Sequence, residues 1–301
     1  MNPEKNARLR ELLKKNEIVV APGCHDTLTA RIIQEIGFPV AYMGGNGSMA
    51  SYIGLPDIGL NTETEMVTRA RYIAQVLDIP LICDADTGYG DVSSVIRTVR
   101  DYESAGVSGI HLEDQVMPKK CGAMAGVQVV PVEEVCAKIR AAIWARRDPN
   151  FMIIGRTDSF NTMGVEETIR RSKLFWDAGA DMLMPENLVT REDVARVAYA
   201  LVNYESPCRK EKPLVMYAVC EFTEGQLFIN HELQEMGYKL VIHPLASILM
   251  ETKAAKKLYS TYMKDGTTKG LFLEDFFEQR PVYQDILGYS DFMEIREKYT
   301  A

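Results

Sequence analysis

Short apolar runs rich in β-branched residues alternate along this chain with longer segments of helical periodicity. The runs, each predicted to form a β-strand, are IVVAPG from Ile18, VAYMGG from Val40, LICDADTG from Leu81, GIHLEDQ from Gly109, MIIGRTDS from Met152, MLMPEN from Met182, LVMYAVC from Leu214 and KLVIHPL from Lys239. The segments predicted to be helical are residues 57–77, 92–105, 131–147, 165–178, 191–204, 224–236 and 245–262. Apolar strands that alternate with helices are typical of a parallel sheet.

The number of these units predicts the architecture. Eight strand runs in 301 residues favour an α/β fold of the closed (β/α)8 type, a TIM barrel, built as a single domain over residues 1–301. An open doubly wound sheet is the alternative, because periodicity alone does not distinguish the two. The runs begin apolar and end in residues such as Asp, Glu, Arg, His or Gly. In a parallel barrel these polar ends converge on one mouth.

The pattern changes after about residue 264. Residues 264–301 are interpreted as a C-terminal helical extension, divided near Arg280 and Pro281. The first of its two helices carries an apolar stripe formed by Leu271, Phe272, Phe276 and Phe277. This stripe packs either on the chain's own barrel or on a neighbouring subunit, and the sequence leaves both open.

Composition and charge exclude several classes of protein. The chain is 47% hydrophobic and 25% charged, and its formal net charge is −8. We therefore expect neither nucleic acid nor an anionic membrane as a partner, because both require a basic surface. The apolar runs are too short to span a bilayer, and the charged N-terminus is unlike a signal peptide. None of the six cysteines forms a CxxC pair, so a reducing cytoplasm is expected.

Two carboxylates follow the third strand run within the sequence DADTGYG. On an extended strand Asp84 and Asp86 point to the same face, so their like charges favour sharing a cation. Oxygen ligands suit Mg²⁺, with Mn²⁺ as a second choice, and Glu113 after the next run can add a third oxygen. The competing interpretation is that one Asp caps a helix and the other forms a turn.

A glycine-rich loop carries the sequence Lys119-Lys120-Cys121-Gly122. Adjacent ammonium groups are expected to lower the pKa of the Cys121 thiol, which suits proton transfer or nucleophilic attack. Glycines also permit the loop to move as a lid. The alternative is a basic surface loop with an incidental cysteine. The cysteines expected to be inert core residues are Cys83, Cys136 and Cys220.

Three further strand ends offer groups that bind a carboxylate substrate. Arg156 can hold a carboxylate with two parallel hydrogen bonds, and Glu186 is expected to orient it; a structural ion pair is the alternative. Gly44 and Gly45 allow backbone N–H groups to approach an anion. His111 lies two residues before Glu113 and is expected to share its face.

The order of the motifs DADTGYG, HLEDQ, KKCG, GRTD and PEN resembles the isocitrate lyase/phosphoenolpyruvate mutase superfamily over almost the whole chain. The resemblance implies a (β/α)8 barrel whose last helix is exchanged between subunits, usually in a homotetramer. It implies an Mg²⁺ site at Asp84, Asp86 and Glu113 with Asp57 in the surrounding carboxylate shell. The residues implied to bind or act on a 2-hydroxy or 2-oxo acid are Gly44, Gly45, Arg156, Lys119 and Cys121.

The KKCG motif matches the lyase branch of that superfamily, of the 2-methylisocitrate lyase and 2,3-dimethylmalate lyase type. The implied reaction is Mg²⁺-dependent retro-aldol cleavage of a substituted 2-hydroxy dicarboxylate to pyruvate, or a similar 2-oxo acid, plus a carboxylate. Tyr42 or a carboxylate of the metal shell is the expected base, and Cys121 the expected proton donor. The alternative is an oxaloacetate decarboxylase, or a mutase acting on phosphonopyruvate or phosphoenolpyruvate.

Several positions depart from the usual lyase pattern. Ala123 follows the KKCG motif where a His is usual, and Val127 stands where a basic residue is frequent. Gly44 replaces a frequent Ser, and the segment 217–220 lacks a usual Asn. Each change removes a polar contact to the region of the substrate's second carboxylate. The sequence therefore favours a smaller, methylated malate such as 2,3-dimethylmalate over a tricarboxylate.

Overall fold

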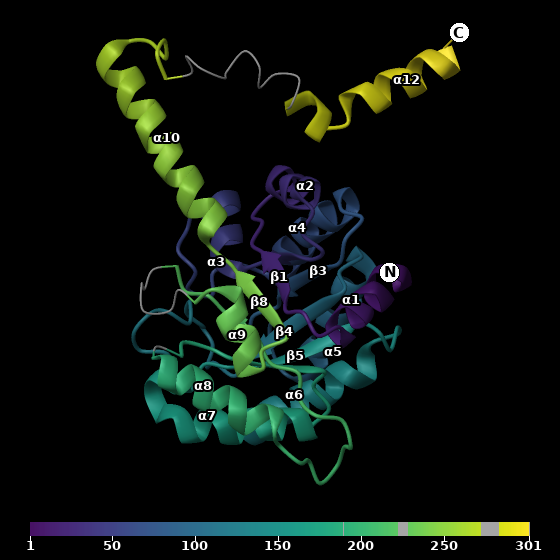
Figure 1. Ribbon diagram of the computed structural model, residues 1–301, viewed down its shortest axis with the longest axis vertical. Helices are drawn as coiled ribbons and strands as arrows, with labels where there is room; N and C mark the ends of the chain where they lie inside the picture. Colours follow the sequence, from purple (N-terminus) through teal and green to yellow (C-terminus); the bar gives the residue numbers. More distant parts are fainter. Residues whose placement is uncertain (189, 222–227, 272–282, 301) are drawn as a thin grey trace.

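The eight predicted strands are all present in the computed structural model, which describes residues 1–188, 190–221, 228–271 and 283–300 (Figure 1). The strands are β1 (Val19–Pro22), β2 (Ala41–Met43), β3 (Leu81–Asp84), β4 (Gly109–Glu113), β5 (Met152–Thr157), β6 (Met182–Pro185), β7 (Met216–Ala218) and β8 (Leu240–His243). Each lies inside the run that predicted it, and several strands include the first polar residue of the run's carboxyl end, such as Asp84 and Glu113.

The strands pair in parallel and close into a barrel. Five of them pair in the order β2-β3-β4-β5-β6, and three in the order β1-β8-β7. Two isolated parallel bridges join these sheets, Gly23 with Tyr42 and Leu183 with Val215. The predicted (β/α)8 barrel is therefore confirmed over the open sheet, since an open sheet has two unpaired edges.

Helices follow the strands and form the outer layer. They are α2 (Thr27–Ile36), α3 (Gly45–Ser48), the π-helical turn η1 (Met49–Ile53), α4 (Glu63–Val76), α5 (Val92–Ala105), α6 (Val132–Ala145), α7 (Phe160–Asp177), α8 (Arg191–Val202), α9 (Asn230–Met236) and α10 (Ala246–Asp265). The helix predicted over residues 57–77 begins later, because Thr62 forms a capping box with Glu65. The helix predicted from residue 165 extends back to Phe160 across a non-helical Gly164.

The N-terminal segment forms a helix that is not among the helices predicted from the sequence. This helix, α1, spans Pro3–Lys14 and begins at an Asn2 cap. Its Leu9 and Leu13 are buried in the same apolar cluster as the barrel residues Val19 and Ile82. The helix therefore contributes to the apolar packing of the barrel strands. Burial of a leucine side chain contributes about 1.5–3 kcal/mol.

The C-terminal segment projects from the barrel. Figure 1 shows α10 extending away from the barrel at the upper left and α12 (Tyr289–Thr300) at the upper right, while the Ile286 carbonyl accepts a hydrogen bond from Arg31 of α2 at 3.1 Å. Neither helix has a buried residue. Leu271 is described, whereas Phe272, Phe276 and Phe277 of the predicted stripe lie outside the described residues. Within the described ranges, every helix is too short or too polar to cross a bilayer.

Candidate active site

Four carboxylates meet at the carboxyl ends of β3 and β4; we call Asp57, Asp84, Asp86 and Glu113 the acidic cluster. None is more than 6% exposed. The expectation that Asp84 and Asp86 share one strand face is wrong, because β3 ends at Asp84 and Asp86 has a left-handed φ of 46°. The turn is instead fixed by Asp84, whose Oδ1 accepts from the Asp86 N–H at 2.9 Å and whose Oδ2 accepts from the Gly45 N–H at 3.2 Å.

Lys119 places its ammonium group inside the acidic cluster. Its Nζ lies 2.6 Å from Asp57 Oδ1 and 2.6 Å from Asp86 Oδ1, and its side chain is 2% exposed. Burial by itself would lower the pKa of Lys119, but Asp86, Glu113 and the other carboxylates raise it well above its usual value. The ammonium group therefore keeps its proton at neutral pH and neutralises part of the cluster's charge.

The acidic cluster still carries more negative than positive charge. Counting Asp158, five carboxylates face the two cations Lys119 and Arg156, which leaves 5 − 2 = 3 carboxylates without a matching cation. Burial raises the pKa of Glu113 well above its usual value, and neither of its oxygens accepts a hydrogen bond from the described residues. Buried carboxyl groups in such surplus either take up protons or share a cation. An all-oxygen set of this kind fits a divalent ion such as Mg²⁺.

The spacing of the cluster matters for how an ion is held. Three side chains whose ligand atoms all lie within 4.8 Å of one another are His25, Asp26 and Glu251, near the start of α10. Among the described residues, the acidic cluster contains no such group of three, so at most two of its carboxylates contact one ion directly in this arrangement. Mg²⁺ usually keeps several water ligands, so this spacing is consistent with it.

Arg156, on β5, is held by an ion pair with Asp158. Its Nε and Nη2 each donate to one oxygen of the Asp158 carboxylate, both at 2.9 Å. Its Nη1 lies 3.4 Å from Glu113 Oε2. Asp158, rather than the expected Glu186, therefore orients Arg156. Burial raises the pKa of Glu186 to about 7, although Arg156 opposes this.

Tyr42 and His111 form a buried pair in the middle of β2 and β4. The Tyr42 hydroxyl lies 2.8 Å from His111 Nε2, and the two rings are stacked. Burial lowers the pKa of His111 to about 4, against the opposing charge of Asp84, so the imidazole is neutral at neutral pH. His111 is fully buried and lies behind Tyr42, outside the set of residues that line the cavity.

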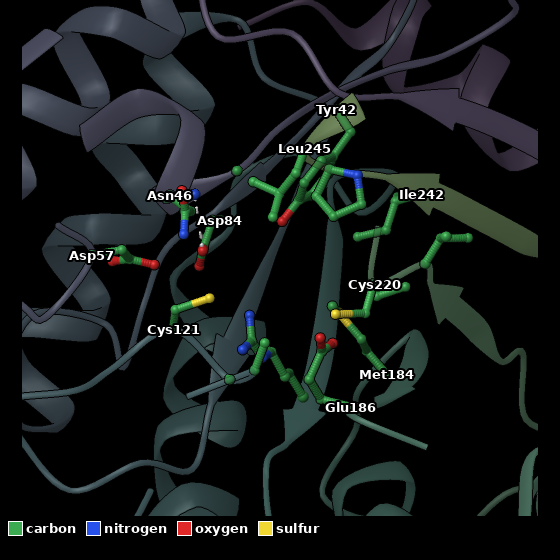
Figure 2. Close-up of a pocket in the computed structure, with 18 residues that line it drawn as sticks. Tyr42, Asn46, Asp57, Asp84, Cys121, Met184, Glu186, Cys220, Ile242 and Leu245 are labelled. Carbon is green, nitrogen blue, oxygen red and sulfur yellow. Dashed lines mark hydrogen bonds between the residues drawn. The ribbon is translucent and has the colours of Figure 1, made fainter. Parts of the chain in front are cut away.

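Cys121 projects its sulfur into the cavity from the loop of residues 119–126, which we call the Cys121 loop (Figure 2). Its backbone N–H donates to the Asp57 carbonyl at 2.9 Å. The expected lowering of the Cys121 pKa is wrong: burial raises it, since the Lys119 ammonium group points into the acidic cluster. A thiol that keeps its proton suits a proton donor better than a nucleophile.

The cavity has two chemically different sides. Figure 2 shows Cys121 and Asp84 on one side, with Glu186 across from Cys121. The opposite side, which we call the apolar wall, is formed by Met184, Ala218, Val219, Ile242 and Leu245. Cys220, expected to be a core residue, also lines the cavity and is only half-buried, because β7 ends at Ala218. Gly44, Gly45 and Ala123 complete the described lining near the Cys121 loop.

Sequence reasoning brought most of these residues together but missed some. Asn46 lines the cavity and hydrogen-bonds the Cys121 thiol. Asn61 donates to Asp86 Oδ2 at 2.8 Å, and Asn187 donates to the Gly122 carbonyl. Short polar residues in loops carry no periodic signal, so only their position relative to a strand end could have indicated them. The apolar wall could not be predicted from the sequence either, because its residues have the same apolar character as the buried core of the strands.

Comparisons of the sequence and of the structure with known proteins identify the same group of enzymes. Residues 9–262 match the family described as phosphoenolpyruvate phosphomutase. The chain is 41% identical to 2,3-dimethylmalate lyase of Eubacterium barkeri over 298 residues, which covers 98% of each chain. It is 36% identical to 2-methylisocitrate lyase of Aeropyrum pernix over 284 residues, 94% of this chain and 87% of that one. A crystal structure of a 2,3-dimethylmalate lyase, described as a PEP mutase/isocitrate lyase superfamily member, superposes with a TM-score of 0.88 at 31% identity, covering 100% of this chain and 96% of that one.

Proposed function

The chain belongs to the PEP mutase/isocitrate lyase superfamily, and from this premise we propose that it is an Mg²⁺-dependent carbon–carbon lyase acting on a substituted 2-hydroxy dicarboxylate. The observation that carries the proposal is the placement of a protonated thiol, Cys121, in the same cavity as Arg156 and as Asp57 and Asp84 of the acidic cluster. A proton donor, a carboxylate-binding cation and a metal-binding cluster are the groups that such a cleavage requires.

The acidic cluster is the proposed metal site. Asp84, Asp86 and Glu113 would hold Mg²⁺, in part through water, with Asp57 in the surrounding shell; Mn²⁺ has the same ligand preferences. The chemistry that such an ion supplies is Lewis-acid stabilisation of the oxygen that becomes the 2-oxo group. The unmatched charge of the cluster and the unbonded oxygens of Glu113 support this assignment.

The proposed binding groups for the substrate lie around this cluster. Arg156 directs its guanidinium group into the cavity beside Glu186, and it binds a substrate carboxylate while Asp158 keeps it in place. Gly44 and Gly45 line the same cavity, and the Gly45 N–H holds Asp84. Lys119, as a buried cation, stabilises negative charge that develops on the leaving fragment.

Proton transfer is proposed to use two separate groups. A carboxylate of the acidic cluster takes the proton of the substrate hydroxyl, while Tyr42, whose hydroxyl lies 2.8 Å from Nε2 of the neutral His111, orients that substrate hydroxyl. The C2–C3 bond then breaks, its electron pair goes to the fragment that contains C3, and the 2-oxo acid is released from the C2 side. Cys121 donates its proton to C3, with the Cys121 loop excluding water.

The apolar wall favours methyl-bearing substrates. Ala218, Val219 and Ile242 present no charged or amide group to the cavity. Ala123, where many lyases of this type have a His, also lines it. A third carboxylate placed here would lose hydration without gaining a partner, whereas a methyl group would gain apolar contact. We therefore propose 2,3-dimethylmalate as the substrate type, with pyruvate and propionate as products.

The C-terminal helices support a proposed assembly. Both α10 and α12 lack buried residues, yet they expose large apolar side chains: Met250, Tyr259, Tyr262, Met263, Phe292 and Ile295. Such helices gain stability when they pack on a second copy of the chain. We propose a homotetramer in which α10 is exchanged between subunits. Light scattering coupled to size-exclusion chromatography should give four times the mass of 33.9 kDa.

A substrate panel tests the proposed activity. The purified protein is assayed for pyruvate with 2,3-dimethylmalate, 2-methylisocitrate, oxaloacetate and phosphonopyruvate, each with Mg²⁺ and with chelator. We expect Mg²⁺-dependent pyruvate and propionate from 2,3-dimethylmalate, and slower cleavage of 2-methylisocitrate. Pyruvate released only from oxaloacetate would instead support the decarboxylase, and conversion of phosphonopyruvate to phosphoenolpyruvate, followed by phosphorus NMR, would support the mutase.

A further inference from the structure

The Cys121 loop rests directly on the ion pair between Arg156 and Asp158. A Cβ atom added to Gly122 would lie 2.5 Å from Asp158 Oδ1 and 2.7 Å from Arg156 Nη2. No side chain fits at such distances, so the loop backbone is in close contact with the base of the cavity. This contact sets how far the adjacent Cys121 reaches into the cavity.

In the part of the chain that the structure describes, two side chains from outside the loop bond its backbone. Gln115 donates to the Lys120 carbonyl and accepts from the Lys120 N–H, both at 2.9 Å, and Asn187 bonds the loop at Gly122. Asn187, which follows β6, donates from Nδ2 to the Gly122 carbonyl at 2.5 Å. Asn187 is only 8% exposed and has a left-handed φ of 61°. Asparagine and glycine adopt this backbone conformation far more readily than other residues. The unusual backbone therefore aims an amide N–H at the loop.

We propose that Asn187 is a positioning residue that holds the Cys121 loop over the cavity through its hydrogen bond to the Gly122 carbonyl. The proposal deepens the proposed function, because it adds a side chain that holds the loop on the other side of Cys121 from the Gln115 bonds to Lys120. Asn187 does not itself reach the reacting atoms; it acts on Cys121 through one backbone carbonyl.

The chemistry of the amide explains why this position needs asparagine. An aspartate has the same size and tolerates the left-handed backbone, but it offers an acceptor to the carbonyl of Gly122 and repels it. A glycine keeps the backbone conformation and removes the donor alone. These two variants separate the hydrogen bond from the backbone conformation, and neither adds bulk to a buried site.

The rate of Cys121 alkylation by iodoacetamide tests the proposal without relying on turnover. Asn187→Gly and Asn187→Asp are compared with the parent in the full chain, both ligand-free and with Mg²⁺ plus pyruvate, and the modified cysteine is identified by mass spectrometry. The exposed Cys208 serves as internal reference for the reagent. The parent should be alkylated at Cys121 more slowly in one of these two states than in the other. In that slower state, loss of the Asn187 hydrogen bond should raise the alkylation rate at Cys121 about fivefold to tenfold. The rate at Cys208 should not change.

Asn203→Asp is the matched control. Asn203 also donates its amide to a backbone carbonyl, that of Tyr199 at 2.9 Å, but at the exposed end of α8. It should leave alkylation of Cys121 unchanged. Thermal unfolding midpoints within about 2 °C of the parent for either Asn187 variant establish that the fold is intact, so one well-folded variant suffices for the comparison.

The outcomes separate this proposal from the proposed function. Equal Cys121 rates in parent and folded Asn187 variants, in both states, would overturn the role of Asn187 even if the enzyme cleaves 2,3-dimethylmalate. Conversely, if Mg²⁺ and pyruvate give the parent no protection, the proposed function is weakened, while the ligand-free rates still decide the role of Asn187.

Discussion

The two sides of the cavity are built from different parts of the barrel and on different principles. On the side formed by the ends of β2 to β5, buried charges compensate one another: Lys119 pairs with Asp57 and Asp86, and Arg156 with Asp158. On the side formed by β6 to β8, the apolar wall presents side chains such as Ala218 and Ile242.

This difference indicates that the two sides of the cavity have separate roles, one in the reaction and one in substrate recognition. Charges in a buried, low-dielectric site act more strongly than in water, so the charged side is suited to the atoms whose bonds change. The apolar wall contributes contact area without direction, which suits recognition of substituents that take no part in the reaction. Changes on the charged side should therefore alter the rate for every substrate, whereas changes in the apolar wall should alter the preference among substrates.

The largest effect should come from the acidic cluster. Asp84→Asn keeps the shape of the side chain but removes the charge to which both Gly45 and Asp86 donate. We expect kcat/KM to fall about 10³-fold for all substrates, as about 4 kcal/mol of transition-state stabilisation is lost. Titration with Mg²⁺ by calorimetry should show weakened binding. Asp91→Asn, an exposed helix cap in the same loop, is the control and should retain activity.

Cys121→Ser should have the next largest effect. Serine is a much weaker acid than the thiol, so donation of the proton to carbon should slow and kcat should fall about 10²-fold. Rapid-quench measurement of pyruvate separates bond cleavage from later steps. The exposed Cys208→Ser is the control. A Cys121→Ser enzyme as fast as the parent would remove this cysteine from the mechanism.

A polar residue in the apolar wall should change selectivity rather than rate alone. Ala218→Asn places an amide at the end of β7, where it can pair with an additional carboxylate but costs apolar contact. The ratio of kcat/KM for 2-methylisocitrate to that for 2,3-dimethylmalate should rise about tenfold. Competition assays with both substrates measure this ratio directly. The exposed Thr64→Asn on α4 should leave this ratio unchanged, and an equal loss for both substrates would contradict separate roles for the two sides.

The smallest effect concerns Glu186, at the boundary between the two sides. Burial raises its pKa to about 7 in the folded protein, above its ordinary value of 4.5. Between these values the folded state binds more protons than the unfolded state, so its contribution to stability falls as pH rises from about 4.5 to 7. Denaturant unfolding of the Mg²⁺-free protein at pH 5 and pH 7.5 should show that Glu186→Gln loses about 1 to 2 kcal/mol less stability over this range than the parent does. The exposed Glu192→Gln should lose as much stability as the parent.

Much of the fold was predictable because its signals are local. An apolar run such as that around Ile153 can bury both faces only in the interior of a parallel sheet, and glycine caps such as Gly106 end the helices. The candidate site was also largely predictable, since residues such as Asp84 and Arg156 lie at the carboxyl ends of strands that converge. Motif order added the identity of the reaction class, which no single strand end could supply.

Other features depend on contacts between distant segments. The pKa of Cys121 could not be read from its neighbours in sequence, because the Lys119 side chain points into the acidic cluster and leaves burial as the main influence on the thiol. The partner of Arg156 was likewise assigned to Glu186 until the structure placed Asp158 against it.

The sequence by itself determined the strand–helix order, the barrel and the residues at its mouth, because the periodicity of apolar residues and the polar ends of strands are written along the chain. Tertiary structure alone decided which charges pair, which residues form the apolar wall and which amide holds the Cys121 loop. The physical reason is that hydrophobic periodicity is a local property, whereas burial and the resulting strength of charges and hydrogen bonds depend on everything that surrounds a group.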